Sequence, residues 1–458
     1  MTRTTLTFLG AAGTVTGSKF LLGVGSRTIL VDAGMFQGVK NLRERNWAPF
    51  PIDPRSISAI LLTHAHMDHS GYLPRLVKQG FSGPIWATDG TIALTEVILR
   101  DAAHIQEQDA KDAAKGGYSK HVTPEPLYTI DDVEQTLSLF RFIDFHTDLD
   151  LGDGIQARYV RSGHILGSAS IRVTTPDTEV VFSGDLGRAD HPVLRKREIP
   201  QGAPTILIES TYGDREHPEW ADQAHEEFAE AIRRTVKRGG SILIPAFAVD
   251  RTEVLLKTLA DMKTAKRIPD LPIYVNSPMG MRALAIYQSA EQRDELREEL
   301  QGADFAGLAK IREVTSVADS IKLNRPKEPS IIISSSGMAT AGRVVHHLEH
   351  MLPDARNTVI FTGYQAMGTR GRALLDGATQ VKMFGRYIPV NAEVLLDDGF
   401  SVHGDASDLL DWLEALRPTP KVVFCVHGED GAPELAKRIR AELGIVAVVP
   451  KQGEKVLL

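Results

Sequence analysis

Three histidines and an aspartate crowd into residues 63–70, directly after the apolar run at 60–62. The four side chains are those of His64, His66, Asp68 and His69. Imidazole nitrogens and carboxylate oxygens are ligands that Zn²⁺ prefers, at about 2.0–2.2 Å. If the backbone stays extended through the first two histidines, both rings point to one face, while the last two side chains reach a second point after the chain turns. One short loop can therefore supply ligands to two metal ions.

The elements that must position this loop follow a pattern in three stretches. From Thr5 to about Thr205, short alternating strands dominate, and the main helix is expected over 92–114. From about 210 to 389, strands alternate with helices, which implies a mostly parallel sheet covered on both faces. After about Val394 the alternating strands return, followed by a helix expected over 432–443.

The middle stretch gives the clearest elements. Helix 221–237 ends at a pair of glycines, a good stop signal. Further helices are predicted over 250–262, 342–352 and 370–375, and strands over 241–244, 273–275, 330–333 and 358–361.

Composition describes an ordinary globular protein of 458 residues, with 42% hydrophobic and 24% charged residues. The single cysteine, Cys425, excludes a disulfide within the chain and favours a reducing compartment. No apolar signal core or membrane-length run is present, so we expect a cytoplasmic protein without a membrane partner. The net charge of -7 argues mildly against nucleic acid, although bound metal ions would add local positive charge.

The loop at 63–70 resembles the HxHxDH signature of the metallo-β-lactamase superfamily of binuclear metallohydrolases, and further motifs follow in order. Asp32, in the run Leu-Val-Asp-Ala-Gly, matches the aspartate that ends an early strand and supports the loop. His164, in Ser-Gly-His, matches the third ligand of the first metal. Asp185, in Phe-Ser-Gly-Asp, matches the carboxylate that bridges both metals.

The last candidate ligand, His427, comes 242 positions after Asp185. The intervening insertion resembles that of the β-CASP nucleases, the group containing the polyadenylation endonuclease, ribonuclease J and Artemis. Glu209 matches motif A, His403 matches motif B and His427 matches motif C. One departure is Val402, which stands where motif B often has alanine.

The resemblance covers essentially the whole chain and implies its fold class, α/β. A metallo-β-lactamase αββα sandwich is expected from residues 1–209 and 395–458. Residues 210–394 would form the inserted β-CASP domain, built on a mostly parallel, doubly covered sheet.

The matched residues suggest a site with two Zn²⁺ ions per chain. The ligand set is His64, His66 and His164 for one ion, Asp68, His69 and His427 for the other, with Asp185 shared. A water activated by the metals would attack the phosphodiester. His403, oriented by Glu209, would give a proton to the departing sugar oxygen. Asp185, Glu209 and His403 are thus the expected catalytic residues.

Phosphate contacts are expected from the insertion. The turn at 334–338 follows an apolar strand and precedes a helix, so its backbone N–H groups suit an anion, and it resembles the Ser-Gly-Met turn of β-CASP proteins. The expected contacts are Ser335, Ser336, Gly337 and Arg372. His346 and His350 lie four apart on one helix face without a third ligand nearby, so an exposed or packed pair is favoured over a metal site.

The leading function is a zinc-dependent ribonuclease that hydrolyses single-stranded RNA in RNA processing or decay. A DNA nuclease of the same architecture typically lacks the motif C histidine, so His427 favours RNA. A non-catalytic RNA-binding subunit is disfavoured because every ligand position is filled. A small-molecule hydrolase would have no use for the inserted domain. The sequence leaves open the mode of cleavage, the base preference and whether the chain forms a homodimer.

Overall fold

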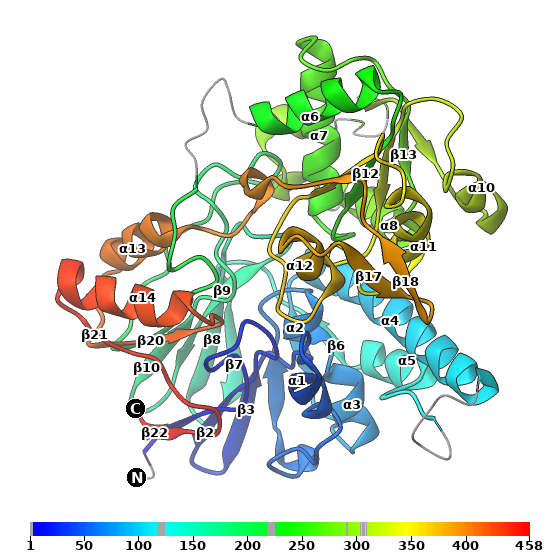
Figure 1. The fold of residues 1–458 in the computed structure, drawn as a ribbon. Coiled ribbons are helices and arrows are strands. Elements are labelled where there is room, and N and C mark those ends of the chain that lie inside the picture. The colour runs from blue at the N-terminus through cyan, green and yellow to red at the C-terminus, as the bar shows by residue number, and fades with distance from the viewer. Residues whose placement is uncertain are drawn as a thin grey trace. The chain divides into compact units, whose positions relative to one another are not determined.

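The computed structural model describes all residues except 1–2, 117–123, 218–224, 290–291, 303, 305–306 and 308. The chain divides into two compact units, one formed by residues 1–216 and 402–458 and the other by residues 217–401 (Figure 1). Among the described helices, none combines the length and apolar character needed to cross a membrane.

The first unit is built on two seven-stranded sheets. In spatial order the first sheet comprises β22 (Lys455–Leu457), β1 (Thr5–Phe8), β2 (Phe20–Val24), β3 (Arg27–Val31), β4 (Ala59–Leu61), β5 (Ile85–Ala87) and β6 (Phe140–Phe142). The second comprises β21 (Val446–Val448), β20 (Val422–Val426), β11 (Thr205–Glu209), β10 (Glu179–Phe182), β9 (Ala169–Thr174), β8 (Ile155–Arg161) and β7 (Asp148–Gly152). The C-terminal segment thus adds strands to both sheets, and β22 pairs with β1 in an antiparallel register.

Helices cover the outer faces of these sheets (Figure 1). On the first sheet lie α3 (Leu73–Lys78), α4 (Asp89–Gly116) and α5 (Ile130–Ser138), and on the second lie α13 (Ala406–Ala415) and α14 (Gly431–Arg438). Apolar residues of both sheets, such as Phe8, Phe20, Phe182 and Phe424, form one core between them. Burial of this alternating apolar surface is what holds the sheets face to face. The four layers are the αββα sandwich that the sequence predicts.

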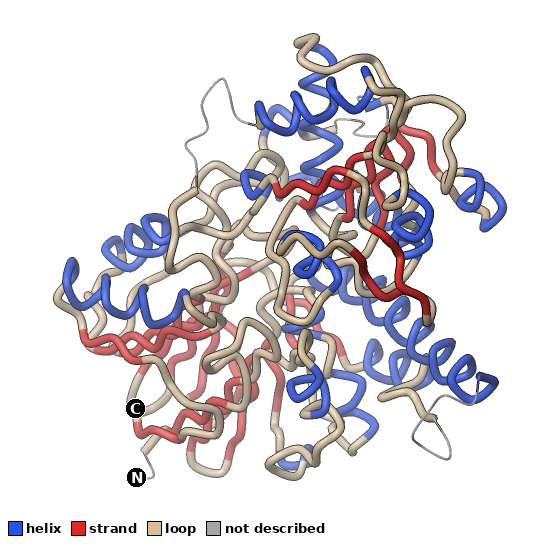
Figure 2. Tube along the Cα trace, in the orientation of Figure 1, coloured by secondary structure: helices blue, strands red, loops and turns tan. Residues whose placement is uncertain are grey.

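The second unit contains a six-stranded sheet in which every pairing is parallel. The strands of this unit are red in the upper half of Figure 2. Its spatial order is β14 (Ile311–Glu313), β13 (Ile273–Val275), β15 (Ile331–Ser334), β12 (Ile242–Pro245), β16 (Thr358–Phe361) and β19 (Glu393–Leu396). Its helices are α6 (Glu226–Lys237), α7 (Arg251–Thr264), α8 (Pro278–Tyr287), α10 (Val317–Lys322), α11 (Arg343–Met351) and α12 (Arg370–Leu375). All residues of β15, β12 and β16, three adjacent strands inside the sheet, are buried, as expected when both faces of a sheet are covered.

A separate antiparallel hairpin in this unit joins β17 (Gln380–Met383) to β18 (Arg386–Pro389). Its inward side chains, Val381, Met383 and Ile388, join the apolar cluster of the unit.

The predicted fold class is confirmed, and most predicted elements lie within a few residues of the observed ones. Helix α6 begins at Glu226, and residues 221–224 of the predicted helix lie outside the described residues. The last helix is split, because α14 gives way to a π-helical turn over Ile439–Leu443. That change of hydrogen-bond pattern leaves no mark in the apolar periodicity of the sequence.

Candidate metal centre

Two groups of buried or half-buried ligand-type side chains lie at the strand ends of the first unit. The first group is His64, His66, His164 and Asp185, and the second is Asp68, His69 and His427. Each member offers one atom, and within a group these atoms lie within 4.8 Å of one another. All seven side chains predicted as ligands are therefore brought together by the fold.

The HxHxDH loop turns as the spacing suggests. His64 follows strand β4 (Ala59–Leu61), and His66 stands immediately before the short helix α2 (Met67–Ser70), which carries the other two ligands of the loop. The backbone of the loop packs directly on the end of β3. A Cβ added to Gly34 would lie 1.5 Å from the carbonyl oxygen of Asp68, so only glycine permits this approach.

Distances in the first group match the edges of a tetrahedral zinc site. His66 Nδ1 lies 3.2 Å from His64 Nε2 and 3.3 Å from His164 Nε2. Asp185 Oδ2 lies 3.4 Å from the same His64 nitrogen and 3.5 Å from the His164 nitrogen. Ligands of a tetrahedral ion with bonds of about 2.0–2.1 Å are separated by about 3.3–3.4 Å. The residues therefore fit a zinc-sized ion.

Asp185 also serves the second group through its other oxygen. Asp185 Oδ1 lies 3.2 Å from His69 Nε2 and 3.6 Å from His427 Nε2, which in turn lies 3.3 Å from Asp68 Oδ2. This buried Oδ1 makes no hydrogen bond in the described part of the chain, although a ring nitrogen is so near. A buried carboxylate oxygen that has no hydrogen-bond partner keeps its lone pairs available for a cation.

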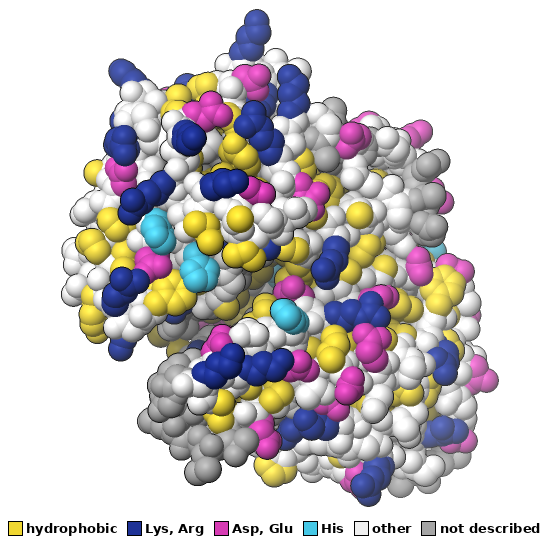
Figure 3. Space-filling model, turned by 90° about the vertical axis from the view of Figure 1, so that its right-hand side faces the viewer, with side chains coloured by type: hydrophobic (Ala, Val, Ile, Leu, Met, Phe, Trp, Pro, Cys, Tyr) yellow, Lys and Arg dark blue, Asp and Glu magenta, His cyan; other side chains and the backbone are white. Residues whose placement is uncertain are grey.

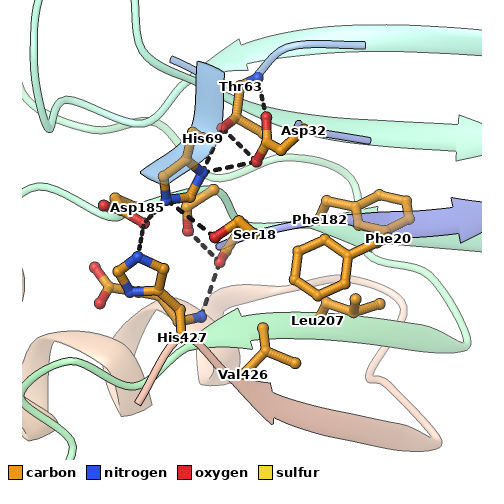
Figure 4. Close-up of a pocket in the computed structure, with 13 residues that line it drawn as sticks. Ser18, Phe20, Asp32, Thr63, His69, Phe182, Asp185, Leu207, Val426 and His427 are labelled. Carbon is orange, nitrogen blue, oxygen red and sulfur yellow. Dashed lines mark hydrogen bonds and ion pairs between the residues drawn. The ribbon is translucent and has the colours of Figure 1, made fainter. Parts of the chain in front are cut away.

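Carboxylate and hydroxyl groups behind the ligands fix their orientation. Asp32 Oδ2 lies 2.8 Å from His69 Nδ1, and its carboxylate also accepts hydrogen bonds from the amide and hydroxyl of Thr63 at 2.8 and 2.9 Å (Figure 4). Thr211 Oγ1 lies 2.9 Å from His427 Nδ1. Each contact holds one ring nitrogen and leaves Nε2 facing the centre.

The electrostatics differ between the two groups. Burial lowers the pKa of His64 to about 3, and it also lowers the pKa values of His66 and His164, so these imidazoles are neutral and ready to bind a metal. For His69, burial alone would lower the pKa, but the carboxylates of Asp185 and Asp32 outweigh it and raise the pKa well above its usual value. The second group thus holds protons that a metal must displace.

The pKa of His427 is also raised, because the nearby Asp185 and Asp68 carboxylates outweigh burial. The reciprocal effect holds the pKa of Asp185 well below its usual range, since the surrounding histidines outweigh the burial of its carboxylate. Asp68 is shifted in the same direction, and its hydrogen bond with His427 is the main favourable cause. Both carboxylates are therefore ionised and available as ligands.

A histidine–glutamate pair lies beside the ligands. His403 Nδ1 lies 3.1 Å from Glu209 Oε1, and the His403 ring centre is 4.3 Å from that of His164. Glu209 is 1% exposed, at the end of β11, and its carboxylate accepts hydrogen bonds from the backbone amides of Leu186 and Thr211. A fixed carboxylate of this kind orients the imidazole. The arrangement presents an oriented imidazole ring next to the metal centre.

A small pocket lies behind the centre, between the two sheets. Its polar wall includes Asp32, His69 and Asp185, and its opposite wall is formed by Phe20, Phe182, Leu207 and Val426 (Figure 4). The ligands are thus backed by the apolar core of the sandwich, which fixes their positions.

The predicted phosphate contacts all lie in the second unit. Ser335 and Ser336 are half-buried in the turn after β15, where Ser335 Oγ lies 2.9 Å from Ser277 Oγ. Gly337 is buried, and a Cβ there would collide with Phe247. Arg372 is exposed on α12, but its Nε lies 2.9 Å from Asp376 Oδ1, so part of its charge is already neutralised.

Sequence reasoning missed the two threonines that orient ligands. Thr63 lies inside the loop quoted above and Thr211 lies two residues after Glu209, both at strand ends. Their positions next to motif residues were the only available signal, because a single hydroxyl leaves no pattern.

Family models match the chain along its length. The metallo-beta-lactamase superfamily matches residues 13–269, the Beta-Casp domain matches 252–374, and the Zn-dependent metallo-hydrolase RNA specificity domain matches 387–450. A metal centre formed by the His and Asp groups described above fits these families.

Similar proteins cover most of the chain. It is 38% identical to ribonuclease TTHA0252 of Thermus thermophilus, across 92% of either protein. It is 31% identical to transcription termination factor FttA of Pyrococcus abyssi, across 99% of this chain and 71% of that factor. A solved protein of unknown function from Enterococcus faecalis V583 has the same fold, with a TM-score of 0.54, 14% identity and full coverage of both chains. The chain therefore belongs to the β-CASP group of the metallo-β-lactamase superfamily and is a metal-dependent hydrolase.

Proposed function

We propose that this chain is a zinc-dependent ribonuclease that hydrolyses phosphodiester bonds of single-stranded RNA in RNA processing or decay. The observation that carries the proposal is the position of Asp185, which offers one oxygen to each of the two ligand groups. Paired cations about 3.5–4 Å apart suit a phosphodiester, because they stabilise charge on both the attacking and the leaving oxygen. RNA is favoured by the match at residues 387–450 and by the relative named as a ribonuclease.

In this proposal the ligands divide as the geometry suggests. Two Zn²⁺ ions would be held by the two groups, with Asp185 shared, and would supply an activated water and charge neutralisation at the phosphate. Asp32 and Thr211 keep the Nε2 atoms of His69 and His427 directed at the centre. These two positioning residues set the ligand geometry without touching the substrate.

The leaving sugar oxygen needs a proton, and in this proposal His403 would give it. Its Nδ1 is held by Glu209, so the proton to be transferred lies on Nε2. The Glu209 carboxylate is itself held by hydrogen bonds from two backbone amides, so its position is fixed relative to the imidazole. We assign Asp185, Glu209 and His403 to catalysis on this basis.

The domain assignment belongs to the same proposal. Residues 1–209 and 395–458 would carry the chemistry, and residues 210–394 would bind the RNA strand. Ser335, Ser336, Gly337 and Arg372 are proposed to contact its phosphates, since the turn places small residues between a strand and a helix and Arg372 is an exposed cation.

A product map tests the proposal. Zinc-loaded protein should cleave end-labelled single-stranded RNA carrying a 5′-phosphate or a 5′-triphosphate, and should cleave DNA of the same sequence more slowly. Asp185→Asn should abolish cleavage, whereas His104→Ala, at an exposed histidine of α4, should retain it. Equal or faster cleavage of DNA would favour the DNA nuclease, and binding of RNA without any cleavage would favour a non-catalytic subunit.

A further inference from the structure

The hairpin β17–β18 exposes aromatic rings that its own stability does not require. Tyr387 is 64% exposed and Phe384 is 51% exposed, whereas the side chains on the inner face are buried. Tyr387 lies directly across the hairpin from Lys382, which is also exposed. Two large exposed aromatic rings on one short hairpin make it a candidate interaction site.

The turn of the hairpin carries a residue that is unfavourable there. Phe384 has φ 49° and the following Gly385 has φ 78°, the two positive values of a type I′ turn. Asparagine followed by glycine is the preferred pair in such a turn, while a bulky residue at positive φ is strained. A phenylalanine at this position, despite the strain, therefore points to a role for its ring.

Neighbouring contacts hold the Phe384 ring and the backbone of the hairpin in place. The ring of His346, on α11, stacks on Phe384 with centres 4.6 Å apart and planes 21° apart. Arg370 donates from Nε to the carbonyl oxygen of Lys382 at 3.0 Å and from Nη1 to that of Thr340 at 2.7 Å. Arg370 thereby ties the hairpin to the segment that follows the turn carrying Ser335 and Ser336.

The charge of this surface favours an anion. Within the described part of the chain, neither Lys382 nor Arg370 pairs with a carboxylate, while Arg386 is paired with Glu349. In the upper part of Figure 3, histidine and hydrophobic side chains lie together on one face, with basic and acidic side chains among them. Aromatic rings beside uncompensated cations are what single-stranded nucleic acids require, because the bases stack and the phosphates pair with the cations.

We propose that this hairpin, with Tyr387 and Lys382 on its outer face and Phe384 beside His346 at its turn, is a stacking platform for the bases of single-stranded RNA. It lies in the second unit and contains none of the candidate metal ligands. The inference rests on the proposed function for the identity of its ligand and names an RNA-binding surface beyond the metal centre.

Equilibrium binding tests the rings. The probe is a fluorescent single-stranded RNA with phosphorothioate linkages, bound to the zinc-loaded full chain and followed by anisotropy, with its integrity checked on a gel. Tyr387→Ala should weaken binding by about 5- to 30-fold, the low part of the range for loss of one stacked base, and Tyr387→Phe should bind normally. Phe142→Ala, at a 51% exposed ring in the first unit, is the matched control and should leave binding unchanged.

Phe384→Asn separates binding from folding. It installs the preferred Asn-Gly pair, so the thermal midpoint should stay the same or rise while RNA binding weakens by a similar factor. A structural role for the ring would instead lower the midpoint. Lys382→Gln should reduce the slope of log K against log salt by about 0.7, whereas Lys455→Gln, at an exposed lysine of β22, should not.

Hydrolysis provides the independent readout. The platform variants should raise KM for long RNA while kcat stays unchanged, and should hydrolyse a nitrophenyl phosphodiester like the wild type. If both ring variants bind RNA within twofold of the wild type, the platform is overturned. A protein partner would then be the alternative occupant of this surface. Absence of RNA cleavage by the wild type would overturn the proposed function. The platform would still be tested, because anisotropy measures RNA binding without requiring cleavage.

Discussion

Asp32→Asn is the substitution that tests the support of the metal centre most sharply. Asp32 has φ 60°, a conformation that asparagine tolerates, so the backbone should be preserved. The asparagine oxygen can still accept from the Thr63 amide, but its NH₂ group would face His69 Nδ1. A donor at that point favours the tautomer with the proton on Nε2, the atom that must bind the metal.

The expected magnitude follows from the contact that is lost. The Asp32–His69 hydrogen bond is 2.8 Å long, buried and charge-assisted, which corresponds to about 1.5–3 kcal/mol. Supporting residues of metal ligands typically change metal affinity by about 10–100-fold, or about 1.4–2.7 kcal/mol. The two estimates agree, so zinc affinity at the second group should fall by about 10–100-fold. The first group should retain its ion, because none of its side chains contacts Asp32 directly.

Competition with a chromophoric chelator measures both affinities on the metal-free chain. Asp153→Asn is the matched control, since Asp153 has a similar φ of 54° but lies on the surface in an ion pair with Arg27. Two unchanged zinc affinities in Asp32→Asn would refute the reasoning. Equal weakening of both ions would show that Asp32 supports the loop as a whole and does not act through His69.

Three further predictions concern neighbouring residues and protons. His403→Ala should slow RNA cleavage by about 10²–10⁴-fold with normal zinc content, and should slow hydrolysis of a nitrophenyl phosphodiester far less, because that leaving group needs no proton; equal losses on both substrates would contradict the general-acid role. Thr211→Val should weaken zinc binding at the second group by about tenfold, while Thr211→Ser should restore it, as chelator competition would show. Because the pKa values of His69 and His427 are raised in the metal-free chain, zinc must displace their protons, and the apparent zinc affinity should be higher at pH 8 than at pH 6. Calorimetry in buffers of different ionisation heat should detect the released protons. A zinc affinity that does not depend on pH would contradict these pKa shifts.

The ligand groups could be anticipated because their residue types are unusual and their order along the chain is informative. Strands such as β4, β10 and β20 end at the same region of the sandwich, so His64, Asp185 and His427 meet there despite their separation in sequence. The parallel sheet of the second unit followed from alternating strand and helix patterns, since each such crossover needs a helix. The use of His64, Asp185 and His427 as metal ligands stays a prediction that metal analysis can test.

Other features depend on tertiary contacts that leave no pattern in the chain. The orienting hydroxyls of Thr63 and Thr211 are single residues whose partners come from distant segments or from the loop itself. Positive φ at Asp32 and His427 is imposed by packing at the strand ends and is not encoded by glycine. The hairpin turn at Phe384 even contradicts local preference, which is why its platform emerged only from the structure.

The central claim is that Asp185 bridges two metal ions, and anomalous diffraction at the zinc edge tests it most directly. Crystals of the zinc-loaded chain should show two peaks about 3.5–4 Å apart, one within bonding distance of His64, His66 and His164 and the other of Asp68, His69 and His427. Each peak should lie beside a different oxygen of Asp185. A single peak, or two peaks that do not share this carboxylate, would contradict the account.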